Sequence, residues 1–192
     1  RMCNTMVEHV PDETFEKVKN TPFYWLDGNH ENFDQLEADG GAWQPGVTYM
    51  PRGSVLEIEG KRLMFFGGAY SVDKYNRTAH VSWWPQEAIQ YGQVQRTLET
   101  VEGPIDALFT HEHATSIPYS NKYKDDIVET HADRNSLEVI LHKYQPKFYF
   151  FGHHHTRDLG KIGDMEWTCC PIIDDYEYTL WDGYEIVTEY IQ

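Results

Sequence analysis

Three short apolar segments of this sequence each run directly into a loop that carries histidine. They read WLDGNHE (25–31), LFTHEH (108–113) and FFGHHH (150–155). Imidazole is the commonest metal ligand in proteins, and the rigid end of a strand fixes the direction of a side chain. Histidines also favour polar loop tips, but that explains one such loop more readily than three. The pattern therefore predicts a metal site that gathers loop residues from these segments. Six of the ten histidines lie in the loops: His30, His111, His113, His153, His154 and His155.

The segments between the loops predict an α/β fold in a single domain, residues 1–192. Strands are expected at 23–26, 105–109 and 148–151, in a hairpin over 53–68, and as two or three strands over 165–192. Helices are expected at 11–19, 85–101 and 136–144, the last capped by Asn135 with Glu138 at its third position. Sites in such folds lie beyond the carboxyl ends of the strands.

Composition excludes several classes of protein. Hydrophobic residues make up 40% and charged residues 24%, which is typical of a soluble globular chain. No apolar run reaches 18 residues, so we expect a cytoplasmic protein without a membrane partner. The net charge of −15 argues against broad, charge-driven binding to nucleic acid. A phosphorylated substrate stays compatible with this charge, because bound divalent cations reverse the local field of a site.

The spacing of the histidines excludes other metal motifs. His111 and His113 are two residues apart after a strand, unlike the helical H-E-x-x-H of zinc proteases. Thr115 and Ser116 stand where the H-x-H-x-D-H pattern of metallo-β-lactamase-like hydrolases needs Asp and His. The three cysteines show no Cys-x-x-Cys spacing, which argues against a thiolate zinc site. A site built from Asn, His and a Gly-His-x-His turn remains.

That set resembles the motifs of one enzyme family. Gly28-Asn29-His30-Glu31 is similar to the G-N-H-[DE] motif of calcineurin-like metallophosphoesterases, and residues 152–155 to their later G-H-x-H motif. His111 sits where the family places a lone histidine. The segments GGAYSVDK (67–74) and VSWWPQE (81–87) resemble the branch found in bacteria and their phages. The resemblance implies a β-sandwich of mixed sheets flanked by helices, without the family's first strands.

The resemblance also implies a role for each motif residue in hydrolysis of a phosphate ester by a water activated between two divalent metal ions. Asn29, His111 and His153 would bind the second ion, and His155 the first. His30 would lie beside the phosphate and protonate the leaving oxygen. The ions would be manganese, iron or zinc, and a phosphomonoester or a phosphodiester, including a nucleotide or nucleic acid, would be the substrate. His113 and His154 have metal-ligand chemistry but lie outside the family's motif positions, and a contact with substrate or with the ligands stays an open alternative for them.

The sequence departs from the family pattern upstream. The family's D-x-H and G-D-x-x-D motifs do not occur, and the chain starts at Arg1 rather than Met. We therefore expect a domain that is incomplete at its N-terminus and, as residues 1–192, inactive. A non-catalytic protein-binding scaffold of the same fold is the alternative, and another binuclear metal hydrolase is a third interpretation.

Overall fold

The fold is built on one six-stranded mixed sheet. The computed structural model describes residues 21–41, 46–119, 128–171 and 177–190. The sheet has the order β3-β4-β5-β6-β8-β7. Four central strands are parallel and the two edge strands are antiparallel to their neighbours. The strands are β3 (Ser54–Ile58), β4 (Lys61–Phe66), β5 (Ala107–Thr110), β6 (Phe148–Phe151), β7 (Asp158–Ile162) and β8 (Met165–Cys169).

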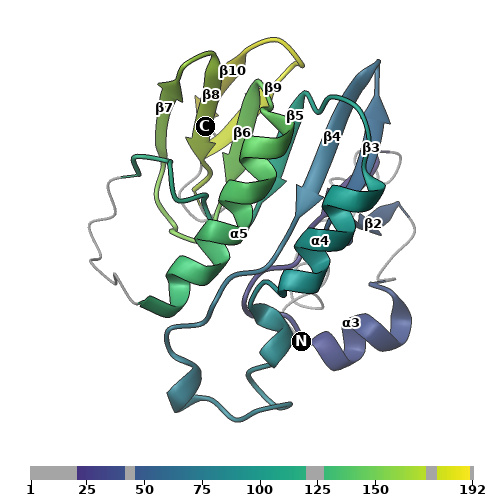
Figure 1. Cartoon of the computed structure of the whole chain (residues 1–192), viewed down its shortest axis with the longest axis vertical. Helices are drawn as coiled ribbons and strands as arrows, with labels where there is room; N and C mark the ends of the chain where they lie inside the picture. Colours follow the sequence, from purple (N-terminus) through teal and green to yellow (C-terminus); the bar gives the residue numbers. More distant parts are fainter. Residues whose placement is uncertain (1–20, 42–45, 120–127, 172–176, 191–192) are drawn as a thin grey trace.

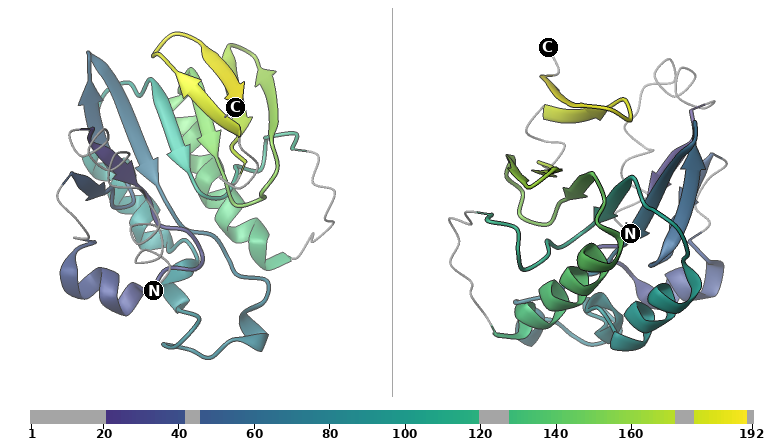
Figure 2. Two further views of the ribbon diagram at one scale, coloured as in Figure 1. Left: turned by 180° about the vertical axis from the view of Figure 1, so that it is seen from behind. Right: turned by 45° about the horizontal axis from the view of Figure 1, so that its top comes forward.

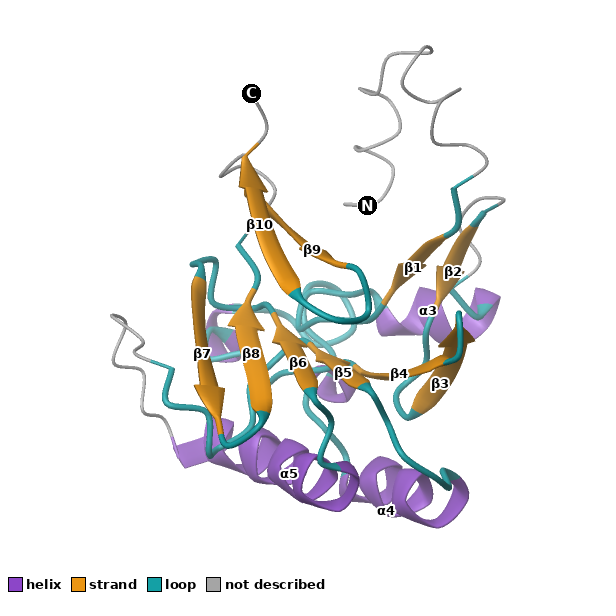
Figure 3. Cartoon of the chain, turned by 90° about the horizontal axis from the view of Figure 1, so that it is seen from above, coloured by secondary structure: helices purple, strands orange, loops and turns teal. Residues whose placement is uncertain are grey.

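Two helices cover one face of the sheet, as Figure 3 shows: α4 (Tyr91–Thr100) and α5 (Val128–Tyr144). Each lies in a connection between parallel strands, α4 between β4 and β5 and α5 between β5 and β6. Leu137 and Ile140 of α5 pack with Leu108 and Tyr149 of the sheet in the larger hydrophobic core. The hydroxyl of Tyr144 donates to the carbonyl of Thr97, 3.0 Å away, and so ties α5 to α4.

Two small strand pairs lie on the opposite face. β1 (Phe23–Trp25) pairs with β2 (Val47–Tyr49) in parallel, and β9 (Glu177–Trp181) pairs with β10 (Ile186–Tyr190) antiparallel. Figure 2 shows the yellow β9–β10 hairpin in front of the sheet in the view from behind. Trp181 packs on Phe148 with ring centroids 5.3 Å apart and on Phe150 at 5.8 Å. Aromatic packing therefore attaches the hairpin to the sheet.

This arrangement confirms the expected mixed α/β fold with helices beside a mixed sheet. The strand predicted over 148–151, the hairpin over 53–68 and the strands of the C-terminal part are confirmed within a residue or two. The helix predicted over 11–19 lies outside the described residues. No described helix combines the length and apolar character needed to cross a membrane.

The helix predicted over 85–101 is wrong at its start. Pro85 begins only a short 3₁₀ helix, η2 (Pro85–Glu87), and α4 starts at Tyr91. Ala88, with φ −70° and ψ 151°, has extended backbone and separates the two elements. The side chain of Glu87 accepts a hydrogen bond from the backbone of Trp84, which stabilises the separate turn.

The helix predicted over 136–144 is too short. α5 begins at Val128, so Asn135 lies inside the helix and does not cap it. The side-chain oxygen of Asn135 accepts from Thr115 at 2.8 Å, and Glu138 accepts from the backbone of Ser116 at 2.8 Å. Both side chains thus hold the loop after β5 against the helix. The two residues that resemble a helix cap in the sequence therefore form tertiary hydrogen bonds instead.

Candidate metal centre

Three loops meet where β1, β5 and β6 end. In Figure 1 the arrowhead of β4 points toward the lower edge of the sheet, and β5 and β6 run parallel to β4. Asn29 follows β1, His111 follows β5 and His153 follows β6. The Nε2 atom of His111 lies 3.1 Å from Oδ1 of Asn29 and 3.2 Å from Nδ1 of His153. Three side chains from distant parts of the chain thus converge through atoms that can bind a metal.

The donor atoms of these three residues fit a divalent cation. Ligands about 2.0–2.2 Å from an ion lie roughly 3 Å or slightly more from one another, which matches the observed spacing. His111 Nε2 carries at most one proton, so it can donate to only one of its two neighbours. A shared cation would satisfy all three atoms at once.

Burial keeps the two histidines in the form that binds metal. Burial, and then the neighbouring His153 ring, lower the pKa of His111 to about 3. Burial likewise lowers the pKa of His153 to about 4, although the nearby Glu112 carboxylate opposes the shift. Both rings are therefore neutral near pH 7. Neutral imidazole presents a lone pair to a metal, whereas imidazolium does not.

A buried carboxylate lies behind the histidines. Glu112, directly after His111, is 1% exposed. Its Oε1 accepts from Nε2 of His154 at 2.9 Å and from the backbone of His113 at 2.9 Å, and the Arg134 guanidinium lies 3.5 Å away. Burial is the largest single effect and raises the pKa of Glu112, but the hydrogen bond from His154 and the electrostatic effect of the His153, His154 and His113 rings together outweigh burial and hold that pKa well below its usual range. Glu112 is not among the residues predicted from the sequence, because only the fold brings His153 and His154 to its carboxylate.

Glu112, His113 and His154 form a second group with metal-ligand chemistry. One ligand atom of each lies within 4.8 Å of the others. Nδ1 of His113 donates to the carbonyl of Ala114 at 2.8 Å, which leaves its Nε2 lone pair facing Glu112 at 3.7 Å. The nearby Arg134 charge repels a cation from this position. We therefore interpret this group as a buried support for the first three residues.

His30 and His155, also predicted as site residues, differ from the other three in exposure. Both side chains are exposed, and among the described residues no hydrogen bond joins either to Asn29, His111 or His153. His153 and His155 have left-handed backbone, with φ of 67° and 54°. Residues other than glycine rarely adopt this backbone conformation, and two of them in one loop indicate strain. Backbone strain of this kind concentrates at functional sites.

Comparison with known proteins places these loops in a family context. The family model for calcineurin-like phosphoesterases matches residues 6–157, which include all three histidine loops. A lariat debranching enzyme from Schizosaccharomyces pombe is 23% identical over 152 residues, covering 69% of this chain and 33% of that protein. One from Drosophila pseudoobscura pseudoobscura is 24% identical over 166 residues, covering 77% of this chain and 31% of that protein. The chain thus spans about a third of the length of these curated relatives.

Solved structures agree on the fold. The protein TT1561 of Thermus thermophilus superposes with a TM-score of 0.59 at 11% identity, over 94% of this chain and 76% of that chain. A second crystal structure gives a TM-score of 0.61 at 13% identity, over 94% of this chain and 71% of that chain. At these identities the likeness concerns the fold alone.

Proposed function

Because the chain belongs to the calcineurin-like phosphoesterase family, we propose that it hydrolyses a phosphate ester with the help of bound divalent metal ions. The observation that carries this proposal is the convergence of three donor atoms. Nε2 of His111 lies 3.1 Å from Oδ1 of Asn29 and 3.2 Å from Nδ1 of His153. These atoms come from the three loops that the strand-end pattern singles out. Membership of the bacterial and phage branch stays a prediction.

The proposal gives each site residue a separate task. Asn29, His111 and His153 would hold one ion, and His155 would contribute to a second. Manganese, iron and zinc all suit this set of nitrogen and oxygen donors. A bound divalent ion supplies Lewis-acid chemistry, polarising the phosphate and promoting ionisation of the attacking water.

His30 is proposed as the proton donor to the leaving oxygen. It is next to Asn29 in the sequence, and its side chain is exposed, so a substrate can reach it. A correctly placed general acid contributes about 10²–10⁴-fold to a rate. A protein-binding scaffold would have no use for this residue beside a phosphate.

The relatives bear on the substrate. Both are named lariat debranching enzymes, which favours nucleic acid among the phosphate esters considered. The net charge of −15 means that such a substrate would be recognised at the site itself rather than drawn by the overall field. We therefore propose a phosphodiester within nucleic acid as the first substrate to examine.

Residues 1–192 on their own are further proposed to show no significant phosphoesterase activity. The family's D-x-H and G-D-x-x-D motifs, which the resemblance associates with the first ion and the bridging carboxylate, do not occur in this sequence. One protein ligand, His155, is too few for a catalytic ion of this kind, which normally has three. Turnover should then fall below the roughly 1 per second of ordinary enzymes.

The test combines metal titration with hydrolysis of bis(4-nitrophenyl) phosphate by residues 1–192. We expect saturable Mn²⁺ binding that His153→Ala abolishes, with no significant release of nitrophenol. Absence of metal binding would overturn the proposed function and favour the scaffold. Turnover at ordinary enzyme rates would support the function but contradict the proposal of an incomplete site.

A further inference from the structure

We propose that Ser71, itself held by the ion pair of Glu87 and Arg77, fixes the side-chain amide of Asn29 so that its oxygen faces His111. Ser71 is then a positioning residue: it acts on the metal through Asn29 and contacts neither metal nor substrate. The inference rests on the proposed function, in which Oδ1 of Asn29 is a metal ligand.

The two ends of the Asn29 amide meet different partners. Nδ2 donates to Oγ of Ser71 at 3.0 Å, whereas Oδ1 lies 3.1 Å from Nε2 of His111. Asn29 is 7% exposed and Ser71 is 1% exposed, so water does not compete freely for either group. An amide rotated by 180° would place NH₂ at the metal position. NH₂ cannot bind a cation, since it has donors only.

The hydroxyl of Ser71 is set to accept from Asn29. A hydroxyl has one proton to donate and two lone pairs. The proton of Ser71 is engaged by Oε2 of Glu87, in a short hydrogen bond, with the backbone carbonyl of Asn29 at 3.0 Å as the other acceptor. Nη1 of Arg77 donates to the same hydroxyl at 2.8 Å. What remains on Ser71 is a lone pair, and only the NH₂ end of the amide can use it.

An ion pair between Arg77 and a fully buried carboxylate sustains this polarity. Glu87 is 0% exposed, and its Oε1 lies 2.8 Å from Nη2 of Arg77 while its Oε2 lies 3.2 Å from Nη1. Paired charges of this kind keep the carboxylate an acceptor. The carboxylate therefore draws the Ser71 proton away from Asn29, and the direction of every hydrogen bond follows from one charge.

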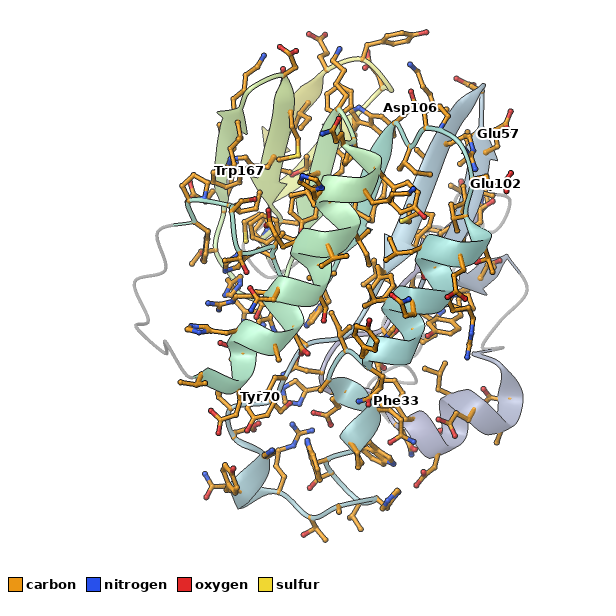
Figure 4. All side chains as sticks on the ribbon, viewed as in Figure 1. Phe33, Glu57, Tyr70, Glu102, Asp106 and Trp167 are labelled. Atoms are coloured by element: carbon orange, nitrogen blue, oxygen red, sulfur yellow. The ribbon has the colours of Figure 1, made fainter. Side chains whose placement is uncertain are left out.

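The backbone around the network is fixed as well. Gly68 donates to the carbonyl of Asp27 at 2.9 Å, which joins the loop after β4 to the loop that carries Asn29. Asp27 forms a buried ion pair with Arg52 at 2.6 Å, and the same guanidinium donates to the carbonyl of Glu87 at 3.2 Å. Figure 4 shows Tyr70, next to Ser71, near the lower end of α5, at the edge where the parallel strands end.

The experiment compares Ser71→Ala with Ser54→Ala in the intact chain. Ser54 is a matched control, since its hydroxyl is buried without a hydrogen-bond partner in the described part of the chain. The first readout is NMR of the Asn29 side-chain NH₂, assigned by its loss in Asn29→Asp. Ser71→Ala should increase its exchange with solvent at least about tenfold, as expected when a buried hydrogen bond is lost. Ser54→Ala should not.

The second readout is Mn²⁺ affinity, which should fall by about 10–100-fold in Ser71→Ala, the usual effect of losing a group that orients a ligand. If Ser71→Ala does not fold, Ser71→Cys replaces it, because a thiol keeps the volume with a weak hydrogen-bonding group. A folded variant with unchanged amide exchange and unchanged affinity would overturn the inference. Altered exchange in a chain that binds no metal would support the orienting role while the proposed function fails.

Discussion

The Nε2 atom of His153 lies 3.9 Å from Oε2 of Glu112, a buried oxygen that has no hydrogen-bond partner within the described residues. The other nitrogen of the same ring, Nδ1, faces His111. Histidines that bind metals commonly donate their second N–H to a carboxylate, which fixes the tautomer and the ring orientation. Glu112 is placed to do this for His153, and a small movement of the ring would bring the two atoms within hydrogen-bonding distance.

Glu112→Gln should therefore weaken Mn²⁺ binding by about 10–100-fold while the chain stays folded. The amide keeps the shape of the carboxylate but loses the charge that faces His153 and Arg134. Isothermal titration measures the affinity, and Glu102→Gln, at an exposed position, serves as the control. Equal affinity in both variants would mean that Glu112 has a structural role only.

In a chain supplied with the family's D-x-H and G-D-x-x-D motifs, His30→Asn should reduce turnover by about 10²–10⁴-fold and leave the metal content nearly unchanged, as loss of a general acid does. His153→Ala should instead lower metal occupancy, since it removes a proposed ligand. Metal analysis together with phosphodiesterase assays separates the two effects. The division of tasks is wrong if His30→Asn loses as much metal as His153→Ala.

Asp133 should make stability depend on pH. Burial raises its pKa to about 6, against the opposing hydrogen bond from the backbone of Ile89, and its Oδ2 has no partner among the described residues. A folded-state pKa above the unfolded value means that the native state favours the protonated carboxyl. The contribution of protonated Asp133 to the free energy of unfolding is therefore fully present below about pH 4 and is lost as the pH rises through 6. The shift corresponds to roughly 3 kcal/mol.

Asp133→Asn removes that titration. Relative to the unchanged chain, the variant should gain free energy of unfolding at pH 7.5 but not at pH 4. Urea unfolding at the two pH values measures the difference, and comparison with the unchanged chain cancels the contributions of other groups. An equal effect at both pH values would show that Asp133 does not titrate as described.

Trp181→Ala should destabilise the chain by about 3 kcal/mol, because the indole ring packs on Phe109, Phe148 and Phe150. Tyr184→Ala, in the turn of the same hairpin, is the control and should change the free energy of unfolding by less than about 0.5 kcal/mol, since Tyr184 is 71% exposed. Thermal or urea unfolding gives both values. A similar loss in the two variants would contradict aromatic attachment of the hairpin.

The sequence predicts what depends on local pattern. His111 and His153 are predicted to lie together because each follows an apolar strand closely, and the parallel strands β5 and β6 bring their ends to one edge. Asn29 follows β1, which lies outside that sheet, and its role as a ligand is predicted only from the family resemblance. Glu112 and Ser71 are missed because their importance comes from partners on other elements: His154 after β6, and Glu87 in η2. Glu112 stands between two histidines, but the sequence does not show that His154 donates to it, and nothing in the neighbours of Ser71 distinguishes it from ordinary polar residues.

Helix boundaries show the same limit. Asn135 has the chemistry of a helix cap, but it lies in the middle of α5. Its side chain accepts a hydrogen bond from Thr115 of the loop after β5. Pro85 has the chemistry of a helix start, yet Glu87 is needed at the Ser71 network and the helix begins later. These side chains form tertiary contacts instead of helix caps. Such contacts cannot be predicted from neighbouring residues in the sequence alone.

The left-handed backbone at His153 and His155 restricts which sequences this loop can evolve through. Valine, isoleucine and threonine are excluded there by the backbone before any chemistry is considered. Glycine fits the backbone but offers no ligand. Asparagine tolerates left-handed geometry better than most residues and carries an oxygen donor. In a library randomised at position 153 and selected for metal binding, histidine and asparagine should survive together, whereas selection for folding alone should enrich glycine.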